Sequence, residues 1–183
     1  RRGCHPWLRQ HYNHLRARES TAPSRYNGGV AIHMELNRII ISETSDEQII
    51  VLKEVGGARA FPIVIGIWEA FAIDRHLKEK NTPRPMTHDL IESVIKNLDG
   101  TLDRIIVSDL KNQTFFAKLL IRRNGKTIEV DSRPSDAIAL AVKMKAPIYV
   151  EEKVLQAIRP EEAPPGTSFE PPEEFKSGPE EET

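Results

Sequence analysis

The chain has 183 residues, of which 39% are hydrophobic and 29% are charged, and its formal net charge is −1. This length and composition are typical of one soluble globular domain whose core needs neither disulfides nor a structural metal. Its longest apolar stretches, around 61–71 and 137–142, are too short or too interrupted to cross a bilayer, which excludes a membrane protein.

Cysteine usage and charge set the expected location and domain limits. Cys4 is the single cysteine, so no internal disulfide can form, and no secretory signal opens the chain; we therefore expect a cytoplasmic protein.

Residues 1–33 carry a net charge of +5, residues 34–158 carry 18 basic and 18 acidic residues, and residues 159–183 carry −6. We expect 34–158 to be the folded domain. The tail, 159–183, holds too little apolar surface to offset the entropy of ordering it, so we expect it to be disordered.

The basic segment 1–33 has no sustained apolar period and ends in two glycines. It is interpreted either as an arm for nucleic acid or as an extension outside the fold, disordered or not native to the protein. The neutral charge of 34–158 lacks the basic excess by which proteins hold DNA or RNA through phosphate neutralisation. Any nucleic-acid activity must then rest on a local patch or a bound metal.

The first half of the domain predicts three strands and two helices. Apolar runs rich in β-branched residues occupy 36–42, 48–55 and 61–66, and the second run ends at Gly56 and Gly57. An Ala-rich helix is predicted to open around Glu69. A shorter trailing helix is predicted from an N-cap at Thr87 to about Leu98, with Gly100 as its stop.

The second half repeats this order. The sequence LDRIIVS at 102–108 is identical to LNRIIIS at 36–42 in five of seven positions, and apolar runs at 114–121 and 127–131 follow. Asn124 and Gly125 predict a hairpin between those runs, and Pro134 suits the first turn of an Ala-rich helix that includes Asp136. The order indicates an internal duplication of a β-β-β-α unit, each copy with a shorter trailing helix. We expect an α+β fold in two layers, with helices packed on a mixed or largely antiparallel sheet.

The two halves diverge in two polar segments. PRPMTHDL at 83–90 differs from its second-half counterpart PIYVEEKV at 147–154, and DSRPSDAIALA at 131–141 differs from the apolar IGIWEAFAIDR of the first half. Both lead into helix N-termini, where backbone N–H groups and the helix dipole favour anions such as phosphate. We predict that 83–89 and 131–136 meet in space and form one polar site.

These segments also carry a family resemblance. FPIVIG followed by Glu69 and Ala70, then PRPMTHDL, DSRPSDAIALA and the closing APIYV resemble, in this order, the signature blocks of the bifunctional nuclease domain family. The resemblance covers about 34–158 and implies a nuclease that acts on DNA, RNA or both.

If the chain is a nuclease, the general chemistry of phosphodiester hydrolysis gives these polar residues candidate roles. Phosphodiester hydrolysis commonly uses a divalent cation held by carboxylates, so Mg²⁺ or Mn²⁺ is expected, with Asp131 and Asp136 as ligands. The candidate catalytic residues are Glu69, His88, Asp89, Asp131 and Asp136, and the candidate phosphate-binding residues are Arg84 and Arg133. Glu69 has apolar neighbours in sequence and needs a partner, for which Arg84 and Arg133 are the candidates.

Each of these residues also has a structural interpretation. Asp136 and His88 suit the first turns of helices, and the arginines suit ion pairs with nearby carboxylates. The whole domain could then be a non-catalytic regulatory or interaction module, and a homodimer stays open. An RNA-binding module without turnover would need exposed aromatics on a sheet face, for which only Phe115, Phe116 and Tyr149 are available, and these are expected in the core.

Overall fold

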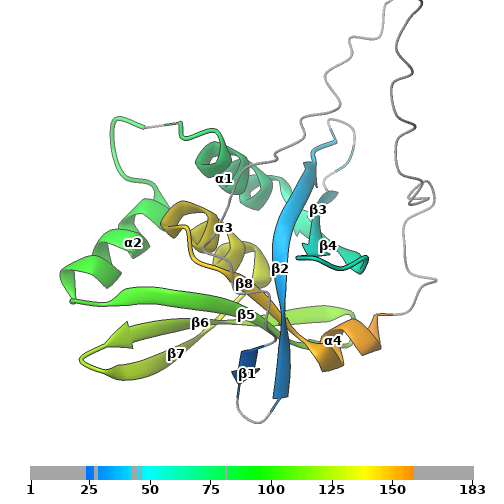
Figure 1. The fold of residues 1–183 in the computed structure, drawn as a ribbon. Coiled ribbons are helices and arrows are strands. Elements are labelled where there is room, and N and C mark those ends of the chain that lie inside the picture. The colour runs from blue at the N-terminus through cyan, green and yellow to red at the C-terminus, as the bar shows by residue number, and fades with distance from the viewer. Residues whose placement is uncertain (1–23, 27–28, 43–44, 46, 81, 159–183) are drawn as a thin grey trace, which may run out of the picture.

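The computed structural model describes residues 24–26, 29–42, 45, 47–80 and 82–158, and it has one mixed sheet with four helices (Figure 1). The strands are β1 (Ser24–Tyr26), β2 (Gly29–Ile40), β3 (Glu47–Glu54), β4 (Ala60–Gly66), β5 (Thr101–Lys111), β6 (Thr114–Arg123), β7 (Lys126–Ser132) and β8 (Ile148–Glu151). The helices are α1 (Ile67–Leu77), α2 (Thr87–Asn97), α3 (Pro134–Met144) and α4 (Glu152–Ala157). The predicted α+β class with a mixed sheet is confirmed.

Strand order follows the internal duplication. The sheet runs β4-β3-β2-β8-β5-β6-β7, and β1 pairs with β2 beside this path. Every described strand pair is antiparallel except β5 with β8. Since β2 runs antiparallel to β8 and β5 runs parallel to it, the two halves run in opposite directions, as halves related by a two-fold axis would. β2, which includes 36–40 of the first repeat, and β5, which includes 102–108, therefore occupy equivalent places, as predicted.

Two β-bulges strengthen this equivalence. The pairing of β2 with β3 shifts register between Leu36 and Arg38, and the pairing of β5 with β6 shifts between Leu102 and Arg104. The two bulges fall at the same position of the repeat. Bulges change the twist and direction of a strand, so both halves bend their first strand at the same place.

The symmetry ends at β8, which separates the two halves and has no counterpart in the first half. It pairs with β2 through 31–34 but with β5 through 105–107. The prediction of a shorter trailing helix in both halves holds for α4, which has 6 residues, and is wrong for α2, which has 11 residues, as many as α1.

The start of the folded domain lies before the predicted boundary. Met34 falls inside β2, which begins at Gly29, and the fully buried Ala31 pairs with Glu151 of β8. Ala31 and Met34 point to opposite faces of the strand and both are buried, so this stretch lacks the one-sided apolar pattern that marks a strand in a sequence. Residues 1–23 and 159–183 lie outside the described residues.

Turn residues follow the backbone conformations that the hairpins require. Asn124 and Gly125 have φ angles of 49° and 72°, which is the two-residue hairpin expected between β6 and β7. Asn112 and Gln113 make the corresponding turn between β5 and β6 with φ of 48° and 59° and no glycine, which the sequence did not reveal. At the end of α2 the left-handed residue is Asp99, with φ 56°, rather than the predicted Gly100.

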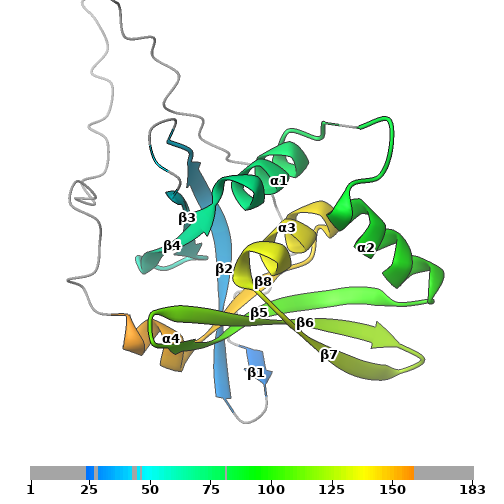
Figure 2. The same cartoon turned by 180° about the vertical axis from the view of Figure 1, so that it is seen from behind.

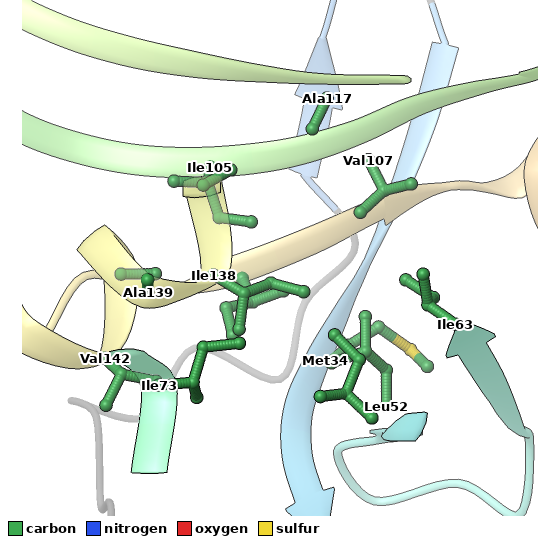
Figure 3. Close-up of a cluster of buried hydrophobic side chains, with 14 of the residues drawn as sticks. Met34, Leu52, Ile63, Ile73, Ile105, Val107, Ala117, Ile138, Ala139 and Val142 are labelled. Carbon is green, nitrogen blue, oxygen red and sulfur yellow. The ribbon is translucent and has the colours of Figure 1, made fainter. Parts of the chain in front are cut away.

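The main core lies between the sheet and the helix layer (Figure 3). Ile138, Ala139 and Val142 of α3 lie beside Ile73 of α1 and the strand side chain Ile105. Most of α3 is buried, because it packs on β5 and β6 on one side and on α1 and α2 on the others, as the two opposite views show (Figures 1 and 2). This central helix fixes the spacing of α1 and α2.

The opposite sheet face carries a small second cluster. Tyr149 is buried there with Ala31, stacks on His33 with ring centroids 5.1 Å apart, and has the guanidinium of Arg104 over its ring. Phe115 packs against Phe61 and the main core, as predicted, whereas Phe116 is 39% exposed.

Within the described residues, none of the helices has both the length and the apolar character that crossing a bilayer requires.

Candidate functional site

The N-terminal turns of α2 and α3 meet through two polar side chains. His88 Nε2 lies 3.1 Å from Asp136 Oδ1, and the imidazole is buried while the carboxylate is partly exposed. Pro134 stands at the start of α3 as predicted, so Asp136 sits in its first turn. The prediction that 83–89 and 131–136 meet is confirmed for His88 and Asp136, which make this contact within one chain.

Arg133 joins this pair to α1. Its Nε donates a 2.8 Å hydrogen bond to Asp136 Oδ2, and its Nη1 donates one of the same length to Glu69 Oε1. Of the two partners expected for Glu69, the structure selects Arg133. Hydrogen bonding to Asp136 and the charge of that carboxylate raise the pKa of Arg133 above its ordinary value, with a further contribution from Glu69. The side chain is 65% exposed, so the site presents a permanently charged guanidinium to solvent.

Asp89 anchors a second ionic network at the start of α2. Its carboxylate accepts hydrogen bonds from Arg75 Nη2 at 3.1 and 3.0 Å and from the backbone N–H of Met86 at 2.8 Å, and it lies 2.6 Å from Lys143 Nζ. Burial opposes ionisation of Asp89, but the hydrogen bonds from Lys143, Met86 and Arg75 outweigh it and lower the pKa of the carboxyl group. Met86 is the N-cap of α2, one residue before the predicted Thr87. All these donors converge on Asp89, which fixes α2 against α1 and α3.

His76 is a site residue that sequence reasoning missed. It lies in contact with both networks, since Arg75 Nη2 is 3.2 Å from its Nε2 and its ring meets that of His88 edge-on at a centroid distance of 6.2 Å. Burial lowers the pKa of His76 to about 4, and the charges of Arg75 and Lys143 add to this effect. His76 is therefore neutral at pH 7. His76 follows Glu69 by seven residues, and this spacing puts both side chains on one face of a helix. That spacing could have identified His76 from the sequence.

Two predicted residues lie outside these networks. Asp131 is exposed on β7, in register with Lys118 of β6. Arg84 is exposed in the loop before α2, where its carbonyl accepts a hydrogen bond from the Thr82 hydroxyl. Among the described residues, neither the Asp131 nor the Arg84 side chain forms an ion pair with His88 or Asp136.

The expected divalent cation can be tested against this arrangement. One oxygen of Asp136 faces His88 and the other accepts from Arg133. In the part of the chain that the structure describes, no group of three His, Cys, Asp or Glu side chains is placed to hold a metal ion. The residues as arranged thus do not fit a resident cation, because Asp136 would first have to release one of its partners.

The arrangement supplies groups that can move a proton and bind an anion. A histidine oriented by a carboxylate is a common general acid or base. An exposed arginine can bind a phosphate through two parallel hydrogen bonds. The N-termini of two helices point into the same region, which favours negative charge there.

Comparison with known proteins agrees with the sequence resemblance. The family model described as "Bifunctional nuclease domain" matches residues 50–162. An uncharacterized protein of Mycobacterium tuberculosis is 41% identical over 117 residues, which cover 64% of this chain and 70% of that protein. Bifunctional nuclease 1 of Arabidopsis thaliana is 27% identical over 107 residues, or 56% of this chain and 33% of that protein. Bifunctional nuclease 1 of Oryza sativa subsp. japonica is 23% identical over 118 residues, or 62% of this chain and 36% of that protein.

Proposed function

Because the chain belongs to the bifunctional nuclease domain family, we propose that it hydrolyses phosphodiester bonds of DNA, RNA or both where α1, α2 and α3 meet. The observation that carries this proposal is the His88–Asp136 pair beside the exposed guanidinium of Arg133. Two plant relatives named as bifunctional nucleases support the reaction class, although the chain spans only about a third of their length.

The geometry supports a general-base mechanism. Asp136 accepts the N–H of His88 Nε2, which leaves Nδ1 with a lone pair. Nδ1 takes a proton from water as the water oxygen bonds to phosphorus, and the bond from phosphorus to the leaving oxygen breaks. The protonated imidazole then returns the proton to that oxygen. Arg133 neutralises charge on the phosphoryl oxygens after exchanging Glu69 for the substrate.

The test is an assay of the full chain against single-stranded and double-stranded DNA and RNA, with Mg²⁺, Mn²⁺ or a chelator. His88→Ala and Asp136→Asn should each lower the rate by about 100-fold or more, as loss of a general base does. Asp109→Asn is the matched control, because Asp109 forms a surface ion pair with Lys111 on β5. Activity that survives both site variants would refute the proposal. Hydrolysis in the presence of chelator would support this metal-free mechanism over the expected metal-assisted one, and loss of hydrolysis in chelator would support the metal-assisted one.

A second candidate function is a non-catalytic interaction module. It is favoured by an exposed apolar stripe at four-residue spacing on α2 and its cap, made of Met86, Leu90, Val94 and Leu98. A homodimer formed through this stripe is the corresponding proposal for the oligomeric state. Sedimentation of the wild type and of Leu90→Lys, which places a charge in the stripe, tests whether the chain dimerises through it.

We also propose a cytoplasmic location, which the single cysteine supports.

A further inference from the structure

Two aromatic side chains on α1 are unusually open to solvent. Trp68 is 78% exposed and Phe71 is 48% exposed, and their ring centroids lie 6.2 Å apart with an angle of 58° between the planes. Both lie away from the buried face of α1, which holds Ala70 and Ile73, and α1 lies at the outside of the helix layer in both overall views (Figures 1 and 2). The rings therefore form an aromatic platform, defined as Trp68 and Phe71.

The platform borders the site proposed above. Trp68 immediately precedes Glu69, whose carboxylate holds Arg133. Eight residues of helix separate Trp68 from His76, which corresponds to about 12 Å along the α1 axis. A ligand whose phosphate reaches Arg133 could therefore lay a neighbouring aromatic group on Trp68.

The surroundings favour a nucleobase over a protein partner. A protein interface of ordinary size buries roughly 800 Å² on each side, and its centre is depleted of charged residues. Here the two rings share α1 with Glu69 and Arg75, and both of these residues form ion pairs, Glu69 with Arg133 and Arg75 with Asp89. An exposed ring one residue from the carboxylate that holds an exposed guanidinium instead matches a nucleotide, which joins a flat base to an anionic phosphate.

We propose that Trp68, with Phe71 at its edge, stacks an unpaired base of a single-stranded nucleic acid while Arg133 holds an adjacent phosphate. Bases inside a duplex are stacked on each other and cannot reach a protein ring without being extruded. The proposal rests on the proposed nuclease function and assigns single strands as its substrate class.

Fluorescence of Trp68 tests the contact without requiring turnover. The chain has two tryptophans, so Trp7→Phe leaves Trp68 as the only indole. In a Trp7→Phe/His88→Ala background, single-stranded DNA or RNA oligonucleotides should quench the emission. A strand of the same length that lacks its bases, and a blunt duplex, should quench little. Stacking of one base contributes about 1–3 kcal/mol, so Trp68→Ala should weaken single-strand binding at least about 5-fold.

Controls separate stacking from a general surface effect. Trp68→Phe should restore part of the lost affinity, because phenylalanine keeps a ring face. Phe116→Ala removes an exposed ring on β6 and should leave the affinity unchanged. Equal binding of the strand with bases and the strand without them would overturn the proposal. A change in Trp68 emission with protein concentration alone would also overturn it, because it would mean that a second copy covers the platform.

The outcome is independent of hydrolysis. If the wild type cleaves single strands while Trp68 gives no base-dependent quenching, the platform fails and the proposed nuclease stands. If bases quench Trp68 but no phosphodiester is cleaved under any metal condition, the nuclease fails and a single-strand binding site remains.

Discussion

Gly66 lies at the N-terminal cap of α1, close to the carboxylate of Glu69. A Cβ atom at this position would lie 2.5 Å from Glu69 Oε2, whereas the backbone at Gly66 has an ordinary φ of −77°. The contact would be with the end of a flexible side chain. An added methyl group can therefore be accommodated by moving Glu69, without strain in the backbone.

Gly66→Ala is predicted to separate folding from the site geometry. The melting temperature should change by no more than a few degrees, while Glu69 moves off Arg133 and phosphodiester hydrolysis changes by as much as it does in Glu69→Gln. Calorimetry and the oligonucleotide assay measure the two effects. A melting temperature that falls by more than about 10 °C, equivalent to roughly 3 kcal/mol, would mean that Gly66 is needed for the backbone itself.

Asp89 should matter for stability. Its partners Arg75 and Lys143 are 15% and 20% exposed, so Asp89→Asn leaves two largely buried cations short of an acceptor. We expect a loss of about 2–4 kcal/mol in the free energy of unfolding, measured by urea denaturation. Asp109→Asn is the matched change, because Asp109 pairs with Lys111, whose side chain is 67% exposed, and it should leave the free energy of unfolding nearly unchanged. Equal losses in the two variants would contradict the role of Asp89 as an anchor.

His76 makes stability depend on pH. Its pKa is about 4 in the fold and 6.5 ordinarily, so the unfolded chain binds the proton more readily. Its contribution to stability is complete above pH 6.5 and is lost as the pH falls from 6.5 to about 4. The depressed pKa of Asp89 acts in the same direction at still lower pH. His76→Gln should flatten the melting temperature between pH 7 and 4.5, and an unchanged slope would show that other groups dominate.

At the scale of elements, β2 links the two halves through its first residues. Residues 31–34 pair with β8, and Ala31 and Met34 are buried. A chain trimmed to 34–158 loses most of this pairing as well as β1, whereas 24–158 keeps both. We expect the shorter chain to melt about 10 °C or more below the longer one, from the loss of roughly 3 kcal/mol of hydrogen bonds and burial. Similar melts would mean that the domain does begin at Met34.

Many of the strands, turns and helix starts were predictable because local signals agreed with the fold. The repeat 36–42 and 102–108, the turn at Asn124 and Gly125, and Pro134 each report on neighbouring residues, and all three appear in their predicted places. β8 was not predictable in this way. It is four residues long, and what makes it a strand is insertion between β2 and β5, which are distant in sequence.

The residues of the site also fall into those that local sequence signals indicated and those that only the packing brings in. Divergence between the halves pointed to His88, Asp136 and Arg133, which the structure brings together. His76 and Lys143 lie in regular helix, and only the packing of α1 and α2 against α3 places them beside Asp89. A helix position says which face a residue occupies, but not which polar group the neighbouring helix presents to it.

At the scale of the whole molecule, charge balance limits how nucleic acid can be held. Residues 34–158 carry equal numbers of basic and acidic side chains. Nearly all the charges on the three helices around the site are paired with one another, including Asp89 with Lys143 and Glu92 with Lys96. The surface therefore offers few cations from which a bound strand could displace counterions.

Salt dependence of binding should report this directly. If Arg133 and Arg84 supply the phosphate contacts, two neutralised phosphates give a slope of about −1.4 in a plot of log affinity against log salt for single strands. We expect His88→Ala, which keeps both arginines, to show this shallow slope for a short single-stranded oligonucleotide. Arg84→Gln should reduce it by roughly 0.7, and base-dependent quenching of Trp68 should persist at high salt, because stacking does not depend on counterion release. A slope of about −4 or steeper would require six or so cations in contact with the strand. Such a number would place the binding surface outside the junction of α1, α2 and α3, since the charges there are already paired.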